Sequence, residues 1–98
     1  MNEHRDSSNR LTYDFSKLEI KDYLKVTNNI IKQFKLEKAS ELVHGLDETF
    51  QDFKLGRFLV GLECDIWSGY IVIAKNKESE ALVKEIANYV NEAFYKNT

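Results

Sequence analysis

The sequence predicts a single α+β domain in which three helices pack on one face of a small antiparallel sheet of two or three strands. Two observations lead to this fold class. In three segments, apolar residues recur at steps of three and four, as they do on one face of a helix. Between the second and third of these segments, residues 58–66 alternate apolar and polar side chains, and residues 69–75 are again rich in strand-forming residues, which indicates a hairpin. The length of 98 residues suits one domain, which we expect over residues 11–98.

The N-terminal part begins with a polar stretch and leads into the first helix. Residues 1–10 are almost entirely polar, and we expect them to form a disordered tail. The segment 11–15 alternates apolar and polar residues, which is typical of a short strand that would become the third member of the sheet. Ser16 and Glu19 then match a capping box, so the first helix is expected to begin there and to end near Phe34.

A second helix is expected over residues 37–53, because apolar residues again step by three or four. Gly45 lies inside this segment and costs about 1 kcal/mol relative to alanine in a helix. The segment could therefore break at Gly45 into a short helix followed by a loop or strand. The apolar residues that predict the helix are Ala39, Leu42, Val43, Leu46, Phe50 and Phe53.

The hairpin and the last helix complete the domain. In the alternating run 58–66, Cys64 falls on the apolar side. The letters "DIWSG" favour a turn, because Asp and Ser form turns and Gly69 supplies a positive φ. The last helix is expected to begin at Asn76 or Ser79, with acidic residues near its start, and an apolar stripe continues to about Phe94.

Composition and charge narrow the classes of function. The net charge of −2 is unevenly distributed: residues 1–35 hold seven Lys or Arg against five Asp or Glu, and residues 36–98 hold seven against eleven. This acidic bias argues against nucleic acid as a partner and permits a basic one. A single cysteine forms no internal disulfide and suits a reducing compartment. The chain shows no apolar run long enough for a membrane span and no signal peptide at its start, so we expect a cytoplasmic protein without a membrane partner.

The residue types that carry catalysis or metal binding form no recognisable motif. Cys64 would need a nearby base, and the only imidazoles are His4, in the polar tail, and His44. Because Cys64 falls on the apolar register of its strand, a packed thiol is the favoured interpretation. Two histidines and one cysteine make no metal site, and glycine-rich phosphate motifs are missing. We therefore expect no catalytic residues, no metal and no cofactor, and thus no enzyme.

Two features suggest contact with another macromolecule. The predicted second helix carries an acidic stripe, with five acids against one lysine over residues 37–53. A charged face is most often simply solvated, and the alternative is a contact surface for a basic partner. Trp67 is expected at the tip of the hairpin, where it either folds back over the core or anchors a partner. The candidate contact residues are Glu37, Glu41, Glu48, Asp52, Asp65 and Trp67.

The segment "FLVGLECDIWSGYIVIAKNKESEALVKEIANYV", residues 58–90, resembles the C-terminal half of small bacterial immunity proteins. These proteins protect cells from their own polymorphic or contact-dependent growth-inhibition toxins. The likeness lies in the "GLE.D.WSG" turn, the strand ending in "IAK" and the amphipathic helix that follows. It maps onto Gly61, Asp65, Trp67, Ser68 and Gly69, which serve either the turn itself or toxin contact.

The resemblance implies a cytoplasmic protein without enzymatic activity that binds a cognate toxin domain, often a nuclease, and neutralises it. The acidic bias and the missing catalytic motifs agree with this hypothesis. The carboxylates would then pair with Lys or Arg around the toxin's cleft, and Trp67 would fill a pocket. Two alternatives remain at this stage: a structural or regulatory module that forms a homodimer through its hairpin edge, and a small ligand-binding domain or enzyme in which His44 and Cys64 converge on a pocket.

Overall fold

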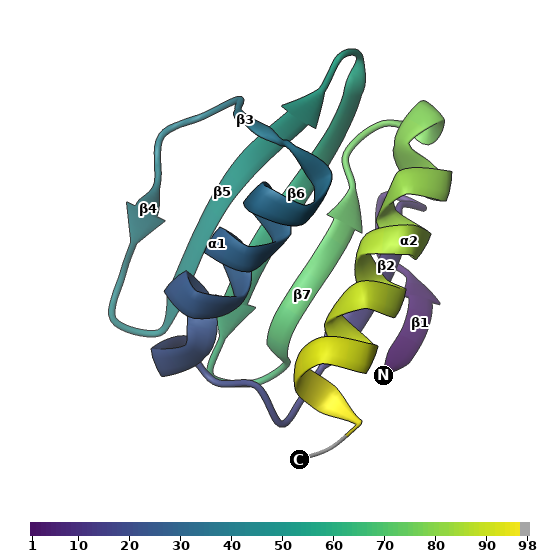
Figure 1. Cartoon of the computed structure of the whole chain (residues 1–98). Helices are drawn as coiled ribbons and strands as arrows, with labels where there is room; N and C mark the ends of the chain where they lie inside the picture. The colour runs from purple at the N-terminus through teal and green to yellow at the C-terminus, as the bar shows by residue number, and fades with distance from the viewer. Residues whose placement is uncertain (97–98) are drawn as a thin grey trace.

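The computed structural model describes residues 1–96 and consists of one antiparallel sheet with two α-helices on the same face (Figure 1). The strand order is β1-β2-β7-β6-β5-β3, and β4 also pairs with β5. The α+β class is confirmed, but the predicted sheet of two or three strands is wrong, because seven strands join it. The strands are β1 (Asn2–Arg5), β2 (Leu11–Phe15), β3 (Glu37–Lys38), β4 (Val43–His44), β5 (Glu48–Leu55), β6 (Phe58–Asp65) and β7 (Gly69–Ala74), and the helices are α1 (Tyr23–Phe34) and α2 (Glu80–Val90).

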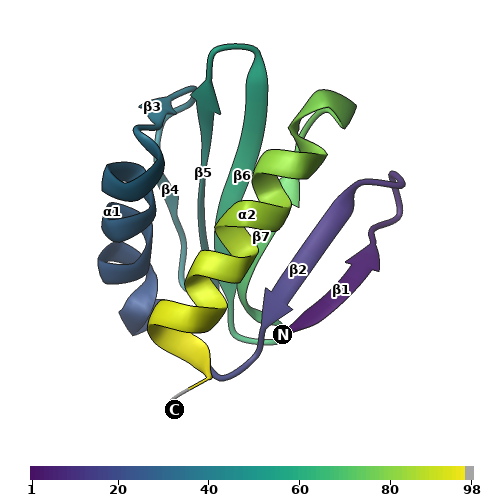
Figure 2. The ribbon, with the colours of Figure 1, turned by 45° about the vertical axis from the view of Figure 1, so that its right-hand side comes forward.

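The hydrophobic core lies between the two helices and the sheet face that they cover. Val26 and Ile30 of α1 and Ile86 of α2 are buried against Leu62 of β6 and Val72 of β7. Two polar contacts fix this layer: the hydroxyl of Tyr23 donates to the Leu62 carbonyl at 2.7 Å, and the hydroxyls of Thr27 and Tyr70 lie 2.6 Å apart. In Figure 2, α2 passes in front of the sheet and α1 stands at its left.

The predicted second helix over residues 37–53 is wrong, because this segment forms β3, β4 and most of β5. In β5, Thr49, Gln51 and Phe53 are buried at a period of two. Two of these inward residues are polar, so the sequence shows no alternation of apolar and polar residues along this strand. The apolar residues of the segment instead recur at steps of three and four, which is the spacing of a helix. Their polar atoms are satisfied locally: Thr49 Oγ1 donates to the Val43 carbonyl at 3.1 Å, and Gln51 Nε2 donates to the Ser40 carbonyl at 2.9 Å.

The N-terminal segment is also ordered differently from the expectation. Residues 1–10, expected to be a disordered tail, contain edge strand β1, which pairs with β2. The expected capping box at Ser16 is wrong as well. The α-helix begins only at Tyr23, after a 3-10 turn at Ile20–Asp22, where the Glu19 N–H donates to Asp22 Oδ2 at 2.9 Å. The polar residues of β1 are compatible with a strand because its pairing is with the backbone of β2.

The predicted hairpin and last helix are confirmed. Strands β6 and β7 pair antiparallel from Val60 opposite Ala74 to Asp65 opposite Gly69. A 3-10 turn at Lys77–Ser79 precedes α2, and a π-helical turn at Asn91–Tyr95 follows it. None of the helices in residues 1–96 combines the length and apolar character required to span a membrane.

Candidate partner-binding surface

The turn between β6 and β7 holds Trp67 outward on a fixed backbone. One carboxylate oxygen of Asp65, Oδ1, accepts the backbone N–H of Trp67 at 2.9 Å and that of Ser68 at 2.5 Å. The Trp67 side chain is 73% exposed. The two alternatives for this tryptophan are thus resolved in favour of exposure at the hairpin tip, and the Asp65 carboxylate serves as a turn-forming group.

Gly69 ends the same turn and lies against the backbone that follows β2. Its φ is +78°, and an added Cβ would meet the carbonyl oxygen of Phe15, the Cα of Ser16 at 2.8 Å and the carbonyl oxygen of Leu18 at 2.9 Å. These neighbours are backbone atoms that cannot rotate away. Only glycine therefore fits here, and this contact fixes the turn relative to the segment 16–18.

Three large apolar side chains are exposed on two turns at this end of the sheet, and we call them the turn surface: Leu46, Ile66 and Trp67. Leu46 is 99% exposed and Ile66 is 60% exposed. The Ile66 N–H donates to the Asp47 carbonyl at 3.1 Å, which joins the turn after β4 to the turn after β6. Large apolar groups that are exposed on neighbouring turns are typical of an interaction site.

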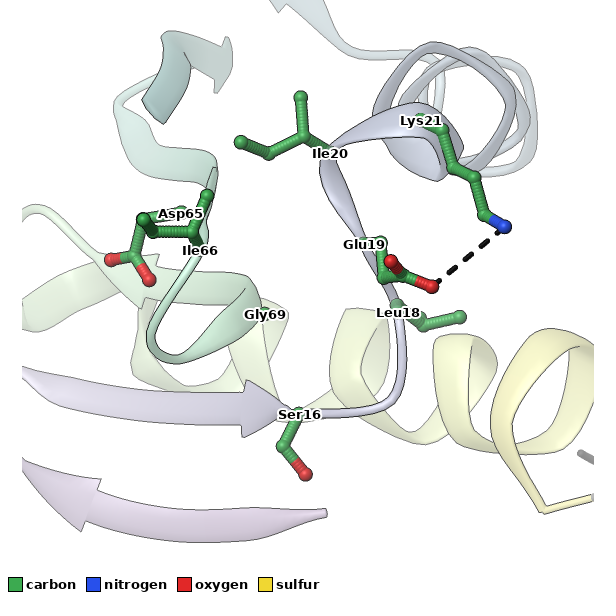
Figure 3. Close-up of a pocket in the computed structure, with 8 residues that line it drawn as sticks. All are labelled: Ser16, Leu18, Glu19, Ile20, Lys21, Asp65, Ile66 and Gly69. Carbon is green, nitrogen blue, oxygen red and sulfur yellow. Dashed lines mark ion pairs between the residues drawn. The ribbon is translucent and has the colours of Figure 1, made fainter. Parts of the chain in front are cut away.

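A shallow depression extends the turn surface towards the start of α1. It has a volume of about 230 Å³, and Ile20 and Ile66 face it from opposite sides (Figure 3). Leu18, Gly69, Glu19 and Asp65 also line it. Lys21 also lines the depression, and its Nζ lies 3.7 Å from Glu19 Oε2, so apolar side chains are combined here with charges of both signs.

A second, more apolar groove lies between α1 and β4, and we call it the α1–β4 groove. Its volume is about 470 Å³. Leu24, which is 61% exposed, and Leu42 line it. Ile20 belongs both to this groove and to the depression beside Ile66, so the apolar surface is continuous between them. The groove residues are Ile20, Lys21, Tyr23, Leu24, Leu42, His44 and Thr49.

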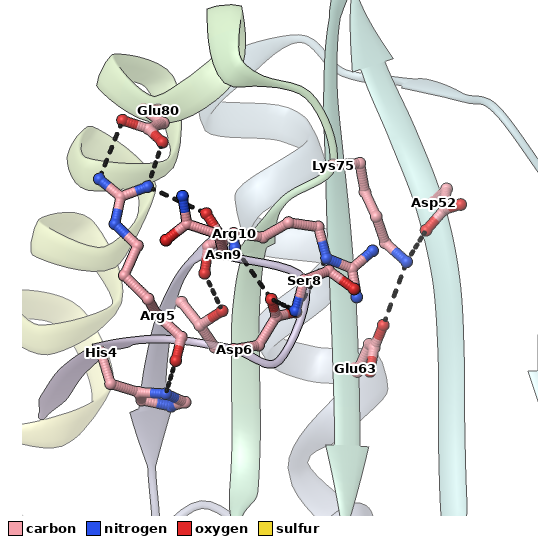
Figure 4. A network of polar contacts seen from close by, with 11 residues as sticks. His4, Arg5, Asp6, Ser8, Asn9, Arg10, Asp52, Glu63, Lys75 and Glu80 are labelled. Carbon is pink, nitrogen blue, oxygen red and sulfur yellow. Dashed lines mark hydrogen bonds and ion pairs between the residues drawn. The ribbon is translucent and has the colours of Figure 1, made fainter.

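On the sheet face opposite the helices, a third depression of about 540 Å³ collects carboxylates, and we call it the acidic depression. It is formed by residues of segment 40–43 and of β5 and β6, together with Lys75. The Nζ atom of Lys75 lies 3.6 Å from Asp52 Oδ1 and 3.7 Å from Glu63 Oε2 (Figure 4). Four acids against one lysine leave the depression with an excess of negative charge. Its residues are Ser40, Glu41, Val43, Glu48, Phe50, Asp52, Glu63 and Lys75.

Glu63 is the most buried carboxylate of this depression. Burial raises its pKa above the usual range, and the nearby Asp52 carboxylate raises it further, while Lys75 opposes both effects. A positive group that enters the depression would stabilise the ionised form of Glu63. The geometry therefore favours a cationic side chain as a guest.

The predicted contact residues fall into three groups. Glu41, Glu48 and Asp52 do come together, although on strand β5 and the segment between β3 and β4 and not on a helix. Glu37 lies apart from them in β3, opposite Lys54. Asp65 lies opposite Glu48 in the register of β5 and β6, and it is the last residue of β6 before the turn that carries Trp67.

Sequence reasoning missed the apolar part of the surface. Ile20, in the 3-10 turn before α1, and Leu24, in α1, belong to the apolar repeat that predicted the first helix and were expected in the core. Leu42 and Leu46 were expected on the buried face of a second helix. The only signal in the sequence was that the predicted helices carry more apolar residues than one buried face requires. This signal does not tell which of these residues stay exposed.

Cys64 and His44 do not form a reactive pair. Cys64 is fully buried, its thiol is directed at the Leu18 carbonyl, and burial raises its pKa to about 12, so it is protonated at neutral pH. His44 is exposed, and its Nδ1 lies 3.1 Å from Thr49 Oγ1. Over residues 1–96, no group of three His, Cys, Asp or Glu side chains is arranged to hold a metal ion.

The opposite end of the sheet carries a polar network that holds β1 in place (Figure 4). Arg5 is paired with Glu80 of α2, and its Nη2 lies 3.3 Å from Glu80 Oε1. Asp6 accepts the backbone N–H groups of Ser8 and Arg10 at 2.9 Å each. These charges are paired within the molecule, in contrast to the carboxylate excess of the acidic depression.

Comparison of the chain with protein-family models, with curated proteins and with solved structures found no match.

Proposed function

We propose that this protein is an immunity protein that binds a cognate bacterial toxin domain and neutralises it by protein–protein contact. The observation that carries the proposal is the exposure of Trp67 on a turn that Asp65 and Gly69 hold rigid. Tryptophan on a fixed backbone contributes a large contact area at little cost in entropy, which is why it is enriched among residues that dominate binding energy.

The surroundings of Trp67 support a basic partner. Ile66 of the turn surface also lines the depression that contains Ile20. The carboxylates of Glu48 and Asp65, which lie opposite each other on β5 and β6, are next to the turn. A toxin that cleaves nucleic acid presents Lys and Arg around its cleft, and complementary charge would speed association and select the correct partner.

The resemblance of residues 58–90 to immunity proteins is a second line of support, because this segment includes the Trp67 turn, β7 and α2. The proposal includes a cytoplasmic location, with which the free thiol of Cys64 agrees.

Co-expression tests the proposal. The gene beside the one for this protein should encode a large secreted protein with a toxic C-terminal domain, and the protein should rescue growth when both are expressed together. Trp67→Ala should weaken binding of that domain by roughly tenfold to a thousandfold. Leu55→Ala, an apolar truncation at the far end of the sheet, is the matched control and should leave binding unchanged. An unchanged Kd of Trp67→Ala for the toxic domain would refute the assigned surface, and no binding to any neighbouring toxic domain would refute the function.

Self-association is the second candidate, because the turn surface and the edge strand β4 would also suit another copy of this chain. Sedimentation at several protein concentrations separates the two functions. A stable dimer that dissociates on Trp67→Ala substitution would replace the immunity proposal.

A further inference from the structure

Strand β4 is an edge strand within an exposed segment. Every residue from 37 to 48 is exposed, and before β5 begins at Glu48 the segment contributes only the two-residue strands β3 and β4 to the sheet. The Gly45 N–H donates to the Glu48 carbonyl at 2.8 Å, so position 45 is bonded towards β5. Since bonding direction alternates along an antiparallel strand, the backbone groups of Leu42 and His44 point away from β5. The edge therefore offers backbone donors and acceptors to another strand.

The two sides of this edge differ in chemistry. Leu42 and His44 line the α1–β4 groove on the helix side. Glu41 and Val43 line the acidic depression on the other side. Four consecutive residues thus present an apolar groove and a cluster of carboxylates in alternation, with the period of two that an extended strand itself has.

We propose that the toxin domain adds an extended strand to β4, with apolar side chains directed into the α1–β4 groove and Lys or Arg side chains directed into the acidic depression. This inference rests on the proposed function and names the form of its partner. In such strand addition, backbone bonds supply affinity and the alternating side chains supply specificity. A guest lysine or arginine would reach past Val43 to Glu41 and Glu48, where one lysine now faces four carboxylates.

Charge argues for a basic foreign strand over a second copy of this chain. Residues 37–48 contain four acids and one lysine. Pairing of two such edges would place carboxylates opposite carboxylates, which destabilises a sheet, whereas a strand with Lys or Arg at every second position brings opposite charges together.

A synthetic peptide tests the strand directly. The probe is a blocked peptide of alternating lysine and valine, roughly seven residues long, which is a usual strand length. The comparison peptide has the same composition with all lysines in one block and all valines in the other. We expect the alternating peptide to bind with a Kd of about 1 mM or below, and the block peptide at least about tenfold more weakly.

Protein variants locate the site. Leu24→Asp introduces a charge into the groove and Glu41→Lys reverses one in the depression, and each should weaken the alternating peptide at least about fivefold. Glu85→Lys makes the same charge change on the exposed side of α2 and should leave binding unchanged. In amide hydrogen exchange, the bound peptide should protect the N–H groups of Leu42 and His44.

Several outcomes would overturn the inference: equal binding of the two peptides, no protection at Leu42 and His44 in the complex, or tight pairing of two copies of the protein through β4. These results are distinct from a failure of the proposed function. If no toxin domain binds but the peptide results hold, strand addition stands and the partner changes; if the toxin binds through Trp67 while the peptide fails, immunity stands and strand addition is wrong.

Discussion

The β6–β7 turn and the segment 37–48 meet where the Ile66 N–H donates to the Asp47 carbonyl, and both present apolar and acidic groups, yet they are held in different ways. The turn is fixed by two backbone bonds to Asp65 and by the packing of Gly69 on backbone. The segment is exposed along its whole length and, before β5 begins at Glu48, contains only two short strands. A rigid anchor lowers the entropy cost of binding, whereas a weakly packed edge can adapt to a partner.

The largest effect on stability is expected from a substitution in the β6–β7 turn. Gly69→Ala should lower the free energy of unfolding by about 3 to 5 kcal/mol, because it combines a left-handed backbone with contact between Cβ and three backbone atoms. Urea unfolding measures it. Gly56→Ala is the matched control, since its φ of +59° is also left-handed but no atom lies within 4 Å of the added Cβ. It should cost about 1 to 2 kcal/mol. Equal losses would show that the packing of Gly69 contributes nothing.

Removal of the Asp65 side chain tests the other support of the turn. Asp65→Ala should cost about 1 to 2 kcal/mol, because the N–H groups of Trp67 and Ser68 lose their acceptor, while Asp65→Asn keeps an acceptor and should cost less. Thermal unfolding gives both values. If the Ala and Asn variants lose toxin binding equally but keep their stability, Asp65 is a direct contact and not a turn former.

The pH dependence of stability tests whether Glu63 is buried in the acidic depression. Because the folded state raises the pKa of Glu63 above its ordinary value of 4.5, the folded protein binds this proton more tightly than the unfolded chain does. The Glu63 contribution to stability should therefore fall as pH rises from that value through the folded pKa, and it should stay constant above. Glu63→Gln should remove this part of the pH dependence. Denaturant unfolding at several pH values checks it, and an unchanged profile would contradict the assigned burial.

The smallest effect on stability is expected in the exposed segment. Leu46→Ser should change the free energy of unfolding by less than about 0.5 kcal/mol, because the side chain is almost fully exposed. Toxin affinity should fall nonetheless, since Leu46 belongs to the turn surface. A loss of stability above about 1 kcal/mol would show that segment 37–48 is packed as firmly as the turn.

The local sequence pattern correctly predicted those elements in which the apolar residues of the pattern are the ones that face the core. The β6–β7 hairpin combined strict alternation with a turn that needs Asp and Gly, and α2 combined an apolar stripe with acidic residues at its start. Strand β5 failed this test, because Thr49 and Gln51 face inward and bond to Val43 and Ser40. No rule of local periodicity reveals that a polar side chain will find its partner across a connecting segment.

The sequence by itself determined an α+β domain, an inward-facing cysteine, an acidic C-terminal part and a tight turn that carries Trp67. Only the tertiary structure decided that Glu41, Glu48 and Asp52 gather beside Lys75, and that Leu24 and Leu42 stay exposed as walls of one groove. The physical reason is the range of the interactions: turns and helix caps depend on residues a few positions apart. Strand pairing and exposure depend on which distant segments meet, so edges and grooves exist only once the sheet is assembled.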